Sequence, residues 1–270
     1  AFLVESLDRG YRTSDQVERT TGLPVLGMMP LLDKASGSPV DYVVSKPLSS
    51  LAESIRAIRN AIHLADVDRP PKTVMVTSSL PSEGKSTFCA ALGRMAALSG
   101  TKTLLIDADL RRPSIAKLFP AITTEVRLED LLQNDLPWQQ AIVQDEKSGL
   151  HLLCAHGNTP LTSELLGSKR MQALLAQVEQ EFDLVLLDTP PIMGISDGWN
   201  LACRVDALVY LIHWSETPRE TVQAAMRQLE VIGIQPSGMV LSMVNMRQQE
   251  KYGYGGYGYY YSKYRRYYHN

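Results

Sequence analysis

A nine-residue segment, Ser79-Leu-Pro-Ser-Glu-Gly84-Lys85-Ser86-Thr87, carries the residue types that bind phosphate. It stands between an apolar run typical of a strand, Thr73–Thr77, and a helical pattern that begins at Lys85. In this context backbone N–H groups hold phosphate oxygens, a lysine adds positive charge and a serine hydroxyl ligates Mg²⁺. Ser79 replaces the usual first glycine of such loops. The residues expected to bind ATP are Ser82, Glu83, Gly84, Lys85, Ser86 and Thr87.

Three aspartates follow two further apolar runs. Asp107 and Asp109 stand at the end of the first run, and Asp188 ends the second. In an open parallel sheet the ligand site lies outside the carboxyl ends of the strands, so we expect these acids to face Lys85. A single aspartate at a strand end is more often a helix cap or turn residue. Three of them beside a phosphate loop favour Mg·ATP chemistry, with Ser86, Asp109 and Asp188 as the magnesium ligands.

The elements that position these residues are short apolar runs that alternate with helical patterns. Continuous apolar strands separated by helices are typical of a parallel sheet covered on both faces. The sequence therefore predicts a doubly wound α/β domain. The expected strands are residues 73–77, 103–107, 150–155, 182–188, 207–213 and 238–244. The expected helices are residues 48–64, 85–99, 168–181 and 219–232.

The segment before residue 48 is polar and is interrupted by glycine and proline, which predicts a linker over residues 1–47. One short helix is expected within it, near Ser14–Thr20. The apolar residues Ala1–Val4 have two interpretations. They are either the end of a membrane helix at which the chain was cut, or a processed start.

Composition excludes several function classes. The chain of 270 residues is 44% hydrophobic, enough for a full core, and its 27 basic against 29 acidic residues give a net charge of −2. This balance does not point to nucleic acid as a partner. Three cysteines without a CxxC pair indicate a reducing compartment. Five histidines without ligand spacing indicate no metal other than Mg²⁺. We expect a cytoplasmic location.

Three charged residues, Glu53, Arg56 and Arg59, recur every third residue of the expected helix 48–64 and share one face of it. From the residues alone, the simplest interpretation is a solvated face with one internal ion pair, which contributes only about 0.3–0.5 kcal/mol.

The C-terminal residues differ in composition from the rest of the chain. In residues 249–270, the tyrosine-rich part has no aliphatic side chain, and its tyrosines are interspersed with glycine. We therefore expect a flexible tail. Interleaved Lys263, Arg265 and Arg266 leave stacking on single-stranded nucleic acid as an alternative, but three cations make a weak electrostatic footprint. A substrate for phosphorylation fits the tail better. Its tyrosines are Tyr252, Tyr254, Tyr257, Tyr259, Tyr260, Tyr261, Tyr264, Tyr267 and Tyr268.

The order and spacing of these motifs resemble those of the bacterial tyrosine kinases, P-loop enzymes of capsule and exopolysaccharide export. Residues 79–87, Asp107-Ala-Asp109-Leu-Arg-Arg-Pro113 and Asp188-Thr-Pro190 look like the Walker A, A′ and B motifs of that family. Glu53-Ser-Ile-Arg56-Ala-Ile-Arg59 is similar to its ExxRxxR oligomerisation motif, and the tail is similar to its autophosphorylation cluster. Residues 5–30 resemble the cytoplasmic exit of the chain-length regulator that precedes the kinase in fused members.

The resemblance implies a P-loop fold of the MinD/ParA type, a kinase domain over residues 48–248 and an autophosphorylated tail over residues 249–270. It implies a ring of identical subunits held by Glu53, Arg56 and Arg59, with an octamer as one expected size. It further implies a cognate tyrosine phosphatase, a membrane chain-length regulator as partner, and a place at the cytoplasmic face of the inner membrane.

For the chemistry, we expect Lys85 to bind the phosphates and Asp107 to accept the proton of the incoming tyrosine hydroxyl, with Asp109 and Asp188 near Mg²⁺. The sequence alone does not distinguish the roles of Asp107 and Asp109. Two alternatives to an autokinase stay open. One is a partitioning or positioning ATPase of the same P-loop class, although the extra lysine of its KGGxGK loop is missing between Ser78 and Glu83. The other is a scaffold that binds ATP without turnover.

Overall fold

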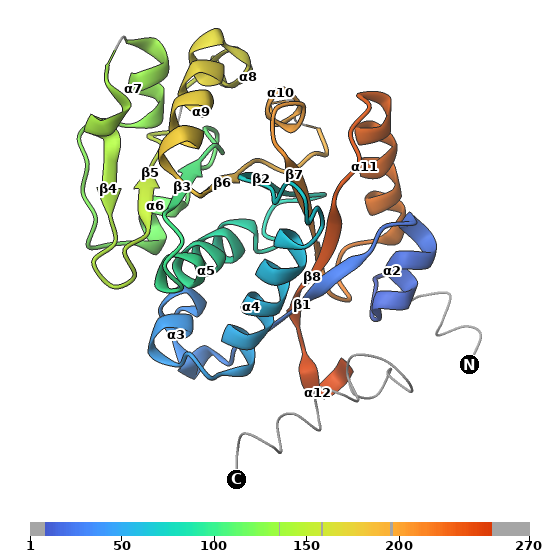
Figure 1. Cartoon of the computed structure of the whole chain (residues 1–270). Helices are drawn as coiled ribbons and strands as arrows, with labels where there is room; N and C mark the ends of the chain where they lie inside the picture. Colours follow the sequence, from blue (N-terminus) through green and yellow to red (C-terminus); the bar gives the residue numbers. More distant parts are fainter. Residues whose placement is uncertain (1–8, 135, 158, 195–196, 250–270) are drawn as a thin grey trace.

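The computed structural model describes residues 9–249 except 135, 158, 195 and 196 (Figure 1). Within them the centre is an eight-stranded sheet in the order β1-β8-β7-β2-β6-β3-β5-β4, in which β4 pairs antiparallel with β5 and the other described pairings are parallel. The strands are β1 (Val25–Pro30), β2 (Thr73–Ser78), β3 (Thr103–Asp107), β4 (Ile142–Gln144), β5 (His151–Leu153), β6 (Leu184–Asp188), β7 (Ala207–His213) and β8 (Gly238–Val244).

Helices cover both faces of this sheet, and a hydrophobic core lies between sheet and helices on each side (Figure 1). One face carries α3 (Pro39–Ser45), α4 (Ser50–His63), α5 (Lys85–Leu98) and α6 (Ile115–Leu118). The other carries α2 (Ser14–Thr21), α7 (Leu128–Gln133), α8 (Thr162–Gly167), α9 (Lys169–Glu181), α10 (Trp199–Ala202) and α11 (Arg219–Val231). Short helices η1 (Lys34–Ser36), η2 (Trp138–Ala141) and α12 (Met246–Gln249) complete the described elements. The predicted doubly wound α/β fold is confirmed.

The periodic patterns located the central elements well. The predicted strands 207–213 and 238–244 match β7 and β8 to the residue, and the predicted helices 48–64 and 85–99 match α4 and α5 to within two residues at each end. These elements are long, and their apolar positions repeat regularly. The two short strands at one edge, β4 and β5, are the exception: β4 was not predicted and β5 is three residues long.

The prediction of a linker before residue 48 is wrong for much of that segment. The short helix near Ser14 is present, but the chain then forms β1, which pairs with β8, and α3, which packs on α5. At Gly27 a Cβ atom would lie 2.5 Å from Cγ1 of Ile58, so the glycine permits close packing of β1 on α4. Residues 14–45 therefore belong to the same α/β body as the phosphate loop.

Two expectations fall on residues that lie outside the described ones. One concerns the apolar start, residues 1–4, and the other concerns the nine tail tyrosines, all within residues 250–270. Within the described part of the chain, no helix combines the length and the apolar composition that a bilayer crossing requires.

Candidate active site

The loop between β2 and α5 has the conformation that its residue types require. Gly84, the last residue before α5, has φ +89°, in the left-handed region that glycine occupies without strain. Ser82 also has a positive φ, +65°. A Cβ atom on Gly84 would approach Cε of Met243 to 3.1 Å. No side chain caps the N-terminus of α5, so its first N–H groups remain available to an anion.

Glu83 lies in this loop, but its side chain turns away from the loop mouth. The carboxylate is buried, and it accepts hydrogen bonds from the backbone N–H of Leu80 (2.6 Å) and from the hydroxyl of Thr217. The carbonyl oxygen of Glu83 accepts from the hydroxyl of Ser242 (2.7 Å). Only the backbone N–H of Glu83 is therefore left for phosphate, and its side chain holds the loop in shape.

Ser79, which replaces the first glycine of the motif, is fully buried at the end of β2. Its hydroxyl lies 2.6 Å from the hydroxyl of Tyr210 on β7, and burial raises the pKa of Tyr210. The departure from the glycine pattern thus places a hydrogen bond between the loop and the neighbouring strand. It does not obstruct the loop mouth.

Asp107 and Asp188 end the adjacent strands β3 and β6 and face each other in register. Both are fully buried, and Oδ1 of Asp107 and Oδ2 of Asp188 have no hydrogen-bond partner among the described residues. Burial, and then the charge of Asp188, raises the pKa of Asp107 well above its usual value. Burial likewise raises the pKa of Asp188 to about 7, although a hydrogen bond from Ser86 and the charge of Lys85 act in the opposite direction.

The two aspartates differ in what holds them. The other oxygen of Asp107, Oδ2, accepts from the backbone N–H groups of Ser114 and Ile115, both at 3.0 Å. The hydroxyl of Ser114 donates to that of Ser86 at 2.6 Å. A pair of buried carboxylates with unpartnered oxygens, beside a serine hydroxyl, is a suitable donor set for a hard divalent cation such as Mg²⁺.

A cavity of about 660 Å³ opens over this group and is large enough for a nucleotide. Its lining includes Lys85, Ser86 and Thr87 from the start of α5 and Asp109 from the loop after β3. Asp109 Oδ1 accepts from the backbone N–H of Arg112 (3.0 Å) and the residue is partly exposed, unlike Asp107. Ser82 and Gly84 also line the cavity, so most of the predicted nucleotide-binding residues share one space.

Asp197 is a contributor that the sequence patterns did not reveal. Arg111, which also lines the cavity, donates from Nε (2.5 Å) and Nη2 (3.1 Å) to the two carboxylate oxygens of Asp197. Asp197 is 1% exposed and also accepts from the hydroxyls of Thr162 (2.7 Å) and Ser163. This cluster orients Arg111 at the cavity. No local pattern marks Asp197, because its partners lie 34 to 86 residues away.

The three charged residues of α4 do not act as one group. Glu53 and Arg56 form an ion pair, and Nη2 of Arg56 also donates to the carbonyl oxygen of Pro47 (3.2 Å). Arg59, one turn further, points elsewhere, and its Nη1 is buried without a hydrogen-bond partner among the described residues. The internal ion pair expected from the spacing is present, and Arg59 is separate from it.

No three His, Cys, Asp or Glu side chains in the described residues are grouped closely enough to hold a metal ion by themselves. A magnesium ion at this site would therefore draw ligands from the hydroxyl of Ser86 and from phosphate oxygens as well as from carboxylates.

Comparison with known proteins gives a consistent result. A model of an AAA-domain family matches residues 71–227, from β2 to α11. The tyrosine-protein kinase YwqD of Bacillus subtilis is 34% identical over 213 residues, which cover 79% of this chain and 90% of that protein. The succinoglycan biosynthesis transport protein ExoP of Rhizobium meliloti is 29% identical over 93% of this chain. The chain spans only 36% of ExoP, and about a third of several other long relatives.

Solved structures resemble the chain as well. The kinase domain of the Escherichia coli tyrosine kinase ETK superposes with a TM-score of 0.78 at 27% identity, covering 84% of this chain and 92% of that one. The septum site-determining protein MinD of Pyrococcus horikoshii, solved with Mg-ADP, gives a TM-score of 0.54 at 16% identity over 63% of this chain and 69% of that one. The second likeness concerns the fold alone, and it agrees with the predicted MinD-like sheet.

Proposed function

Since the chain belongs to the bacterial tyrosine kinases, a family of P-loop enzymes, we propose that it transfers the γ-phosphate of ATP to tyrosines of the tail of a neighbouring copy. The observation that carries this proposal is the juxtaposition of the phosphate loop with the buried, unpartnered carboxylate oxygens of Asp107 and Asp188. Nine tyrosines in residues 252–268 supply acceptors in the same chain.

In the proposed site, the phosphates of ATP are bound by Lys85 and by the backbone N–H groups of residues 82–87, including that of Thr87. Ser86 and Asp188 would ligate Mg²⁺, and Asp109 would contact it through water, so that the Asp109 carboxylate can still accept a proton. When bound, Mg²⁺ neutralises the charge that develops on the phosphate oxygens. Arg111, held by Asp197, lies where it can neutralise charge on the same phosphates.

Sequence patterns leave the base open between Asp107 and Asp109, and burial distinguishes the two candidates. Asp107 is fully buried and its Oδ2 is held by two backbone N–H groups, so a tyrosine from another copy reaches it only if the loop at Ser114 moves. Asp109 lies on the cavity wall. We assign acceptance of the tyrosine proton to Asp109, and orientation of the Ser114 loop and of Mg²⁺ to Asp107. Asp109→Asn should then lower transfer to tyrosine more than ATP binding, whereas Asp107→Asn should lower both.

We further propose that this kinase acts in exopolysaccharide or capsule export, as the name of the relative ExoP suggests for that protein. Its partners would be a membrane chain-length regulator and a cognate tyrosine phosphatase, and its place the cytoplasmic face of the inner membrane. A ring of subunits would bring each tail to a neighbour's site, with Glu53, Arg56 and Arg59 at the contact. Phosphates add about −1.5 to −2 charges each, so extensive phosphorylation would loosen the ring.

The central test is incubation of the chain with Mg·ATP, followed by intact-mass and peptide mass spectrometry, beside the variant Lys85→Met. Multiple phosphates on Tyr252–Tyr268 that are absent in the variant are expected. ATP hydrolysis with an unmodified tail would favour a partitioning-type ATPase, and no turnover would favour a nucleotide-binding scaffold. Self-association is tested by sedimentation of the double variant Arg56→Ala, Arg59→Ala, and an unchanged profile would contradict the ring contact.

A further inference from the structure

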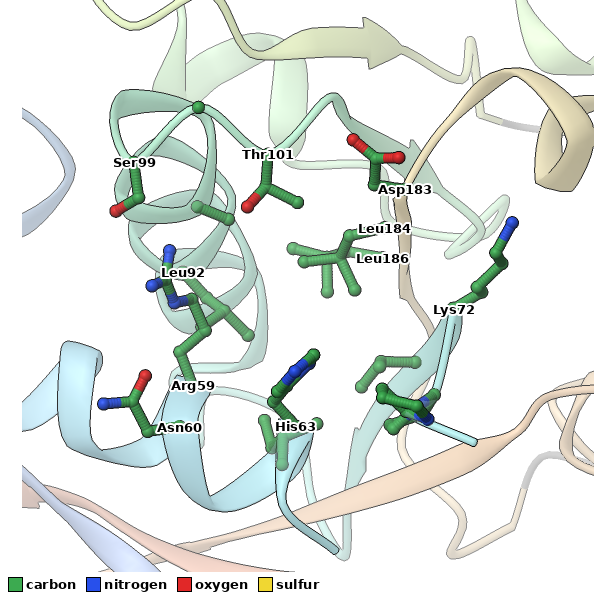
Figure 2. Close-up of a pocket in the computed structure, with 16 residues that line it drawn as sticks. Arg59, Asn60, His63, Lys72, Leu92, Ser99, Thr101, Asp183, Leu184 and Leu186 are labelled. Carbon is green, nitrogen blue, oxygen red and sulfur yellow. The ribbon is translucent and has the colours of Figure 1, made fainter. Parts of the chain in front are cut away.

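A second cavity lies at the opposite end of the sheet from the phosphate loop (Figure 2). It measures about 590 Å³ and is enclosed by the C-terminal parts of α4 and α5 and by the starts of β2 and β6. This volume is typical of sites for small molecules. The cavity shares no lining residue with the proposed ATP site.

The floor of this cavity is apolar. Leu184 and Leu186 of β6 lie at its centre, with Leu92 of α5 to one side (Figure 2). Val74 of β2 also belongs to the lining. Such a floor accommodates an aliphatic or aromatic group, whose removal from water is favourable.

Basic side chains surround the apolar floor. Arg59 and His63 project from α4 on one side, and Lys72 stands at the start of β2 on the other (Figure 2). Nη1 of Arg59 is the buried atom without a hydrogen-bond partner among the described residues. Burial, and then the charge of Arg56, lowers the pKa of Arg59. A buried guanidinium nitrogen without an acceptor is costly, and an anion in the cavity would supply that acceptor when the Arg59 side chain turns toward it.

The remaining charged groups of the cavity do not cancel this preference. Asp183 is the acidic residue in the lining, and its Oδ2 accepts from the backbone N–H of Lys102 (2.9 Å). Lys72 Nζ donates to the carbonyl oxygen of Glu179 at 3.3 Å, so its ammonium group is directed toward α9 and away from the centre of the cavity (Figure 2). Arg59 and His63, over an apolar floor, fit an anion attached to an apolar ring.

We propose that this cavity is a binding site for an aryl phosphate, and that its occupant is a phosphotyrosine of the chain's own tail. The ring would pack on Leu184 while the phosphate accepts from Arg59, with His63 at its edge. A guanidinium matches phosphate geometry well, since both present parallel hydrogen-bonding edges. The inference rests on the proposed function, which produces the phosphotyrosine.

The end of the described chain lies close enough for this occupant. α12 ends at Gln249, which lines a small cavity together with Ala57 and Ala61 of α4. Arg59 and His63 project from another side of the same helix. A helix is roughly 10–12 Å wide and an extended residue spans about 3.3 Å, so eight residues from Gln249 to Tyr257 reach about 26 Å. The tail can therefore reach the cavity of its own subunit.

Occupancy of the cavity would also affect self-association. A phosphate bound by Arg59 would occupy one of the residues that we assign to the contact between subunits. The phosphorylated tail would then weaken the ring by competing for Arg59, in addition to general charge repulsion.

The test uses the full chain carrying Lys85→Met, so that its own tail stays unmodified. A fluorescein-labelled peptide with the sequence of residues 252–261, phosphorylated at Tyr257, is titrated against it by fluorescence anisotropy. The unphosphorylated peptide is the first control, and phenyl phosphate and inorganic phosphate are competitors. Arg59→Gln is expected to weaken binding of the phosphopeptide by at least about tenfold. Arg56→Gln is the matched control on the same helix, since Arg56 pairs with Glu53 and does not line the cavity. Both variants are compared at a chain concentration at which the chain is monomeric by sedimentation, so that loss of the subunit contact does not change peptide binding.

A second variant keeps the test independent of Arg59. Thr101→Trp, at the cavity rim, should fill the cavity and abolish phosphopeptide binding. Equal binding of both peptides, equal effects of Arg56→Gln and Arg59→Gln, or unchanged binding by Thr101→Trp would each overturn the proposal. Displacement by phenyl phosphate but not by inorganic phosphate supports the role of the ring. Because the peptide is synthetic, failure here leaves the kinase proposal intact, and failure of autophosphorylation leaves this binding result intact.

Discussion

The two ends of strands β2 and β6 offer different chemical groups for binding phosphate. At the carboxyl ends, the phosphate loop offers backbone N–H groups at the start of α5, and one lysine completes the charge. At the amino ends, α4 and α5 finish, so the cavity faces the negative ends of two helix dipoles. Phosphate at that end must be held by side chains, which accounts for Arg59, His63 and Lys72 in its lining. Backbone N–H groups would bind phosphate at the first site, and side chains would bind it at the second.

The largest effect should come from Lys85→Met. Loss of the lysine charge should lower tail phosphorylation by at least about 10²-fold, the usual scale for a group that stabilises developing charge. The affinity of the opposite cavity for the phosphopeptide should stay within about twofold, because the two sites share no lining residue. Rates by mass spectrometry and affinities by anisotropy check both halves. A parallel loss of peptide binding would show that the two ends are coupled.

The buried aspartates should make the free protein less stable as pH rises. The pKa of Asp188 is raised to about 7 in the folded state against about 3.9 unfolded, so the folded state binds more protons between these values. Its stabilising contribution is therefore complete below about pH 4 and is lost as pH rises through about 7, on the order of 4 kcal/mol. Melting temperatures from pH 5 to 8 measure it. Asp188→Asn should flatten the profile, and Mg·ADP should stabilise most at pH 8.

Glu83→Ala should destabilise the loop and the fold by about 2–3 kcal/mol, because it leaves the N–H of Leu80 unpaired and opens a void in a buried position. Denaturant unfolding measures the change, and the Michaelis constant for ATP should rise with it. Glu83→Gln is the control, since it keeps the volume and one acceptor oxygen. A wild-type Michaelis constant in Glu83→Ala would mean that the loop keeps its shape without this carboxylate.

The smallest effects concern the opposite end. Arg59→Gln should stabilise the peptide-free chain by about 1 kcal/mol, because it removes a buried donor that has no partner in the described residues. Arg56→Gln should change stability by less than about 0.5 kcal/mol, the scale of an exposed ion pair. Chemical unfolding of both variants checks the contrast. Clear destabilisation by Arg59→Gln would point to a partner for this guanidinium within the chain.

Much of the fold and of the ATP site could be predicted from local patterns. β7, β8, α4 and α5 have regular apolar spacing, and the phosphate loop is a contiguous motif. What the patterns missed depends on partners far along the chain. β1 is a strand because β8, more than 200 residues later, offers it a free edge. Asp197 matters at the cavity because Arg111, 86 residues earlier, is folded against it.

Glu83 shows that a motif predicts which residues form a loop more reliably than it predicts where their side chains point. The position belongs to the phosphate loop, as predicted, but its carboxylate points into the protein toward Leu80 and Thr217. Likewise, the regular spacing of Glu53, Arg56 and Arg59 predicts a shared face, whereas in the packed helix Arg59 lines the second cavity and is separate from the Glu53–Arg56 pair. Helical spacing fixes only the direction in which a side chain leaves the helix axis.

The sequence by itself determined the family, the order of the central strands and helices, and the position of the phosphate loop, since these depend on contiguous residues and on short periodic patterns. Only the tertiary structure decided which aspartates are buried, which arginine is paired and where the second cavity lies. Burial, pKa and unsatisfied hydrogen bonds arise from residues that are distant in the chain and adjacent in space, and no local pattern carries that information.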